Sequence, residues 1–112
     1  MTLTEFLLAR IAEDEDLAKA ARVEDVWPSY PWGIDETERA LQAAYTPGRV
    51  LAECGAKRRI VVEFTSAVDW SQDADCPMPD LYRARAGTIL DVLRLLALPY
   101  TDHHDYRPEW KL

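Results

Sequence analysis

The sequence predicts an all-α fold, a compact bundle of about four helices with an aromatic, proline-rich loop and an ordered C-terminal tail. The chain has 112 residues and only four glycines, and it is rich in Ala, Leu, Glu and Arg, which favour helix. Residues 60–65 are β-branched enough for a strand, but no second alternating run exists to pair with them, so we expect helix there too. A chain of this length fits one domain, residues 1–112.

The first helix is predicted to begin after Thr2, because Thr2 and Glu5 form a capping-box pattern. It should run to about residue 23. Apolar side chains recur near one face, which is the pattern of a helix that packs on a core. They are Leu3, Leu7, Ile11, Ala18 and Ala21, with Phe6 and Leu17 beside them.

Residues 27–33 follow as a loop, since two prolines and a glycine exclude regular structure. The loop carries Trp27, Tyr30 and Trp32. Large aromatic side chains of this kind need burial or a partner. We expect them to cover the helical core, and the alternative is that they line a groove or an interface.

Two further helices are predicted from their starts. Asp35 with Glu38 caps a short helix that ends near Tyr45, and Thr46 followed by Pro47 opens a third. The third should be about 18 residues long, as judged from its helical apolar spacing. Its apolar side consists of Val50, Leu51, Cys54, Val61 and Phe64. Residues 66–79 are expected to form a polar loop.

The last long helix should begin at Pro79 or Asp80 and stop before Pro99. Gly87 interrupts it at a cost of about 1 kcal/mol relative to alanine, which suggests the close approach of another backbone. Its expected apolar face consists of Leu81, Ile89, Val92, Leu93, Leu96 and Ala97.

An acidic band crosses the first helix in a chain whose formal net charge is −7. It consists of Glu13, Asp14, Glu15 and Asp16. Four successive acids point in every direction around a helical turn, so at least one should meet a base such as Lys19 or an arginine. An acidic surface repels nucleic acid and attracts basic partners.

The basic patch consists of Arg49, Lys57, Arg58 and Arg59. It is short and belongs to an acidic protein, whereas nucleic-acid recognition needs a broader positive face. We therefore expect residues 57–59 to pair with the acidic band, within one chain or across a homodimer, and do not expect nucleic-acid binding.

The C-terminal segment combines Asp102, His103 and His104 with large aromatics. Neighbouring side chains of an extended chain point in opposite directions, and no His-x-x-x-His or Cys-x-x-Cys spacing is present. We expect no metal or cofactor. Instead, the aromatic residues Tyr100, Tyr106 and Trp110 should clip the tail onto the helices.

Three stretches make the chain resemble a family of small uncharacterised proteins from actinobacteria and their phages, a domain of unknown function. They are "EFLLARIAEDEDLAKAA", "TPGRVLAECGAKRRIV" and "LRLLALPYTDHHDYRPEW". Members show a His-Asp-Pro-type sequence before the central helix and an Asp-His-Pro-Asp-Tyr tail, where this chain has Tyr45-Thr46-Pro47 and His103-His104-Asp105. The resemblance implies a helical fold and a phage or prophage accessory role, but no activity.

These patterns predict a non-enzymatic protein that binds a protein partner with a basic surface. A homodimer of this chain is one assembly that the patterns allow. The acidic band and the loop aromatics would make the contact. One alternative is an enzyme or a metal- or ligand-binding protein built on Asp102, His103, His104 and Cys76. A second is a nucleic-acid-associated regulator that uses the basic patch.

No apolar run approaches the about 20 residues that cross a bilayer, and the N-terminus has no signal-peptide pattern. We expect a cytoplasmic protein without membrane association. In that reducing setting Cys54 and Cys76 should be free thiols.

Overall fold

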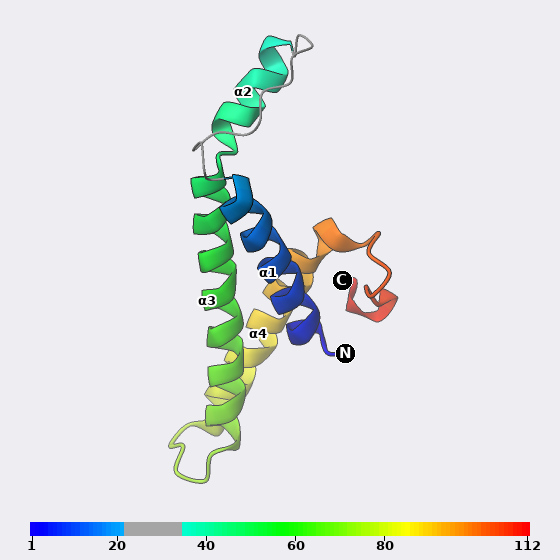
Figure 1. Cartoon of the computed structure of the whole chain (residues 1–112). Helices are drawn as coiled ribbons and strands as arrows, with labels where there is room; N and C mark the ends of the chain where they lie inside the picture. The colour runs from blue at the N-terminus through cyan, green and yellow to red at the C-terminus, as the bar shows by residue number, and fades with distance from the viewer. Residues whose placement is uncertain (22–34) are drawn as a thin grey trace. The chain divides into compact units, whose positions relative to one another are not determined.

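The computed structural model describes residues 1–21 and 35–112, and every regular element in them is helical, so the predicted all-α class is confirmed. Figure 1 shows the elements in chain order. They are α1 (Leu3–Ala21), α2 (Glu36–Ala44), α3 (Pro47–Gln72), α4 (Pro79–Ala97) and the short 3-10 helices η2 (Leu98–Tyr100) and η3 (Pro108–Trp110). The aromatic loop residues Trp27, Tyr30 and Trp32 lie outside the described residues.

The predicted starts of α1, α2 and α3 are confirmed by side-chain caps. A side-chain oxygen before each helix accepts an amide N–H from its first turn, which satisfies a donor that the helix itself leaves open. The bonds run from Glu5 N to Thr2 Oγ1 (3.1 Å), from Glu38 N to Asp35 Oδ1 (2.8 Å) and from Arg49 N to Thr46 Oγ1 (3.2 Å).

Contacts divide the chain into two compact units, Met1–Ala9 with Lys57–Leu112 and Arg10–Ala56. We call them the first and the second unit, and the single-domain organisation stays a prediction. The first unit holds a hydrophobic core built from α1, α3, α4 and the tail. Its buried members are Leu3, Phe6, Leu7, Val61, Leu93, Ala97 and Trp110.

Helix α3 is longer than predicted. It has 26 residues and ends at Gln72, so residues 66–72 are helix and the expected loop shrinks. Two polar residues of this part of α3 are accommodated in the helix because their hydroxyls bond back to carbonyls one turn earlier. Thr65 Oγ1 donates to Val62 O (3.0 Å) and Ser71 Oγ to Val68 O (2.7 Å). Residues 60–65 are helical, as predicted.

The buried face of α4 also differs from the prediction. Ala86, Leu93 and Ala97 are buried, whereas Leu81 and Val92 are exposed. Gly87 does not mark a close approach within the described chain, since a Cβ built on it would meet nothing within 4 Å. Leu81 and Val92, which were predicted to belong to the packed face of α4, therefore lie on its solvent-exposed side.

The second unit buries Ile11 and Ala18 of α1 and Cys54 of α3. Helix α2 belongs to the same unit, but none of its residues is buried. In this helix Thr37, Ala40, Leu41 and Ala44 recur at helical spacing, and 60% of Leu41 is exposed. The second unit thus presents an amphipathic helix whose apolar side is not used in the described structure.

Candidate functional site

The tail after α4 is bent by successive backbone turns. His103 N donates to Tyr100 O (2.9 Å), and Tyr106 N donates to His103 O (3.0 Å). Pro99 lies within η2 rather than in an extended segment. Because the backbone turns here, neighbouring side chains of the tail can face the same side, which an extended chain forbids.

The aromatic side chains of the tail gather around Phe6, near the start of α1. Figure 1 shows the ribbon of the tail, in red, close to this end of α1. The ring of Trp110 lies 5.1 Å from that of Phe6, and the rings of Tyr100 and Tyr106 lie 6.2 Å and 6.0 Å away. The two tyrosine rings meet Phe6 edge-on and the Trp110 ring is tilted by 47°, and edge-on contacts at these distances are favourable between aromatic rings. The predicted docking of an ordered tail is confirmed.

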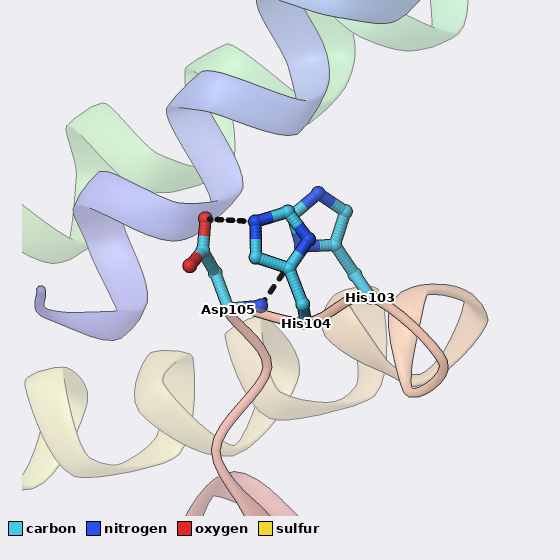
Figure 2. Close-up of side chains that lie close together, drawn as sticks. All are labelled: His103, His104 and Asp105. Carbon is cyan, nitrogen blue, oxygen red and sulfur yellow. Dashed lines mark hydrogen bonds and ion pairs between the residues drawn. The ribbon is translucent and has the colours of Figure 1, made fainter.

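Figure 2 shows His103 and His104 side by side with Asp105. The two imidazoles are stacked with centroids 4.4 Å apart, and His103 also meets the Phe6 ring at 5.6 Å. Potential ligand atoms of His103, His104 and Asp105 all lie within 4.8 Å of one another. The expectation that neighbouring histidines diverge is wrong for this segment, because the turn brings their rings together.

Hydrogen bonding limits what this cluster can bind. The Asp105 backbone N–H donates to Nδ1 of His103 (3.1 Å), so the neutral ring carries its proton on Nε2. A metal at His103 would have to displace either that amide or that proton. His104 Nε2 lies 3.5 Å from Asp105 Oδ2, on the solvent side. The candidates Asp102 and Cys76 do not belong to this group.

The acidic band is only partly displayed. Glu13 accepts a hydrogen bond from the buried Arg10 (Nη2 to Oε1, 2.8 Å), which is the basic partner expected for one member of the band. Asp14 and Glu15 are half-buried, whereas Glu13 and Asp16 are exposed. Two of the four acidic residues are therefore well exposed, and one of these two, Glu13, is bound by Arg10.

Two arginines of the basic patch form ion pairs with glutamates of α3 itself. Arg49 pairs with Glu53 (3.1 Å) and lies over the Tyr45 ring at 4.5 Å, and Arg59 pairs with Glu63 (2.9 Å). Lys57 and Arg58 are half-buried. Local pairing thus accounts for the charges of Arg49 and Arg59 without the acidic band or a nucleic acid.

One feature of the first unit could not be predicted from the sequence. A hollow of about 270 Å³ opens between α3 and α4, lined by Glu63, Ser66, Ala67, Trp70, Tyr82 and Arg85. The rings of Trp70 and Tyr82 stack 6.0 Å apart, and Arg85 donates to Glu63 (2.9 Å). No local pattern signals this hollow, because residues 66–72 were expected to be loop and Trp70 lies among them.

The pH dependence of stability should report the pairing of Glu63. Hydrogen bonds from Arg59 and Arg85 lower the pKa of Glu63 below its ordinary value of 4.5. Stability from this pairing is therefore present above pH 4.5 and is lost as the pH falls through the lower folded-state pKa. In thermal unfolding Glu63→Gln should have a slightly lower Tm than the wild type near neutral pH, and the difference should vanish in acid.

The exposed Glu109→Gln provides the control, since it should leave the Tm unchanged throughout. A Tm difference for Glu63→Gln that persists at the most acidic pH would contradict the assignment.

Within the described residues, the longer helices are all too polar to traverse a lipid bilayer. No curated protein matches the chain, and no solved structure matches it. A family profile does match, over residues 1–112. The chain therefore belongs to the family of unknown function DUF6221.

Proposed function

We propose that this chain is a non-enzymatic interaction protein whose second unit binds a protein partner with a basic surface. The observation that carries the proposal is helix α2, which is capped and amphipathic but has no buried residue in the described structure. An amphipathic helix with an exposed apolar side suits a groove on a partner. In this proposal α2 is the principal contact, and the acidic band contributes its exposed members Glu13 and Asp16.

The charge of the second unit supports a partner with a basic surface. Three acids, Asp35, Glu36 and Glu38, stand at the start of α2 against a single base, Arg39. The whole chain carries a net charge of −7. A partner groove rimmed by lysine or arginine would complement this surface, and complementary charge speeds encounter and selects partners.

The two alternatives have weaker support. A metal or ligand site at the tail would have to compete with the Asp105 amide for Nδ1 of His103. A nucleic-acid contact through the basic patch would have to compete with the ion pairs that Arg49 and Arg59 make with Glu53 and Glu63.

The proposed setting is the bacterial cytoplasm, in an actinobacterium or its phage. The origin rests on the three sequence stretches that resemble such proteins. Cys54 and Cys76 are both buried, and the proposed reducing compartment would keep them as thiols.

The test places a photo-crosslinking amino acid at position 41 and exposes the protein to an actinobacterial lysate. We expect one crosslinked protein with a basic surface, whose affinity is then measured with the purified pair. Glu36→Gln with Glu38→Gln should weaken binding by about tenfold and flatten its salt dependence, because both rim charges are lost.

The matched control is Asp102→Asn with Glu109→Gln, which removes the same charge from exposed positions of the first unit. This control should bind like the wild type. Circular dichroism verifies that the total helix content of both variants matches that of the wild type. Equal binding by the α2 variant and its control would reject the proposal.

A further inference from the structure

The outer face of α4 has a symmetric arrangement of residue types about Thr88. Leu81 and Leu95 lie seven residues on either side of Thr88, and 56% and 53% of their surfaces are exposed. At 3.6 residues per turn, positions three, four and seven residues from Thr88 all share its side of the helix. Every residue at these positions is exposed: Leu81, Ala84, Arg85, Asp91, Val92 and Leu95.

When a second copy of this face is turned end for end and placed against the first, the facing residue types are complementary. Leu81 then stands opposite Leu95, Ala84 opposite Val92, and Arg85 opposite Asp91. Such a surface complements itself under a two-fold axis, as an isologous dimer requires.

We propose that α4 pairs antiparallel with α4 of a second copy of this chain, on a two-fold axis at Thr88. The axis itself lies at the small side chain of Thr88, with Ala84 on the same side and Gly87 at the edge of the face. Space beside Gly87 is open, since a Cβ there would meet nothing within 4 Å. A second backbone can therefore approach on the Gly87 side, where the described residues of a single chain place no neighbour within 4 Å.

Charge selects the antiparallel arrangement. A parallel pair in register would place Arg85 against Arg85 and Asp91 against Asp91, whereas the antiparallel pair makes two Arg85–Asp91 contacts. Within one chain Arg85 contacts Glu63 (2.9 Å) and Asp91 contacts Arg94 (3.5 Å). Even so, 55% of the Arg85 side chain and 58% of the Asp91 side chain stay exposed and can reach a second partner.

The size of the face sets the strength of the dimer. Helix α4 has 19 residues, and one helix against another buries less than the about 800 Å² per partner of a standard interface. We expect a reversible dimer with a micromolar Kd. This surface belongs to the first unit, so the proposal is independent of the partner-binding role of α2.

Sedimentation equilibrium on the full chain tests the pairing by charge reversal. Arg85→Asp and Asp91→Arg should each raise the dimer Kd by about tenfold, since each places like charges opposite one another. The double variant R85D/D91R should recover most of the affinity, because the pair is restored in reverse. A chain that stays monomeric at about 100 µM, well above a micromolar Kd, would overturn the proposal.

Disulfide trapping tests the axis itself. Thr88→Cys should form a covalent dimer under mild oxidation, because the two introduced sulfurs would meet at the axis. Arg83→Cys is the control, since it is exposed on the opposite side of the same helix, and the wild type controls for Cys54 and Cys76. Equal crosslinking by the two variants would overturn the assigned face. So would a dimer that R85D and D91R both leave unchanged.

Discussion

Replacing Phe6 by alanine is expected to lower the free energy of unfolding by about 3–5 kcal/mol, the range for truncating a buried aromatic side chain. Phe6 is fully buried, and its ring meets Tyr100, His103, Tyr106 and Trp110. Total stability of a domain this size is about 5–15 kcal/mol, so the loss is a large fraction of it. Urea unfolding followed by far-UV circular dichroism measures the change.

Leu17→Ala is the control in the same helix, because 64% of Leu17 is exposed. Its expected effect is within about 0.5 kcal/mol. Similar losses for the two variants would show that Phe6 does not organise the core of the first unit.

Trp110→Ala is expected to cost about 3 kcal/mol and to free the tail from the first unit, because a buried tryptophan is lost. Trp110 is the buried residue of η3, and its ring contacts Phe6 at 5.1 Å and Tyr106 at 5.7 Å. Without the Trp110 side chain, the backbone hydrogen bond from Tyr106 N to His103 O (3.0 Å) loses the contact that keeps the tail docked. Hydrogen exchange at the Tyr106 amide should accelerate strongly relative to amides in the middle of α3.

The exposed neighbour Lys111 offers a matched change, and Lys111→Ala should alter neither stability nor exchange. Unchanged protection of the Tyr106 amide in Trp110→Ala would mean that the tail is ordered without docking. If hydrogen exchange becomes faster only in the tail and the free energy of unfolding stays unchanged, the tail docks on the core but does not stabilise it.

Local sequence determined where the helices of this protein begin. Thr2, Asp35 and Thr46 cap α1, α2 and α3 through bonds that span only three residues. Such contacts need no distant partner, so they can be recognised from a short window of sequence. The helical state of residues 60–65 could be predicted because the sequence has no second alternating run that would pair with them as a strand.

Tertiary structure decided how far α3 runs and which side of α4 is buried. The polar residues near Gln72 are typical of a loop when the sequence is considered alone. In the folded chain Trp70 stacks on Tyr82, which lies ten residues beyond the end of α3. On α4 both sides carry apolar residues, and periodicity cannot tell which of them meets Phe6 and Trp110.

The histidine pair shows the same division between local and distant information. His104 is exposed to solvent. The ring of His103 instead contacts Phe6, from the opposite end of the chain, and stacks on His104 because of the turn. Caps are local and could be read from the sequence; burial depends on contacts between residues far apart in the chain, so only the folded structure decided it.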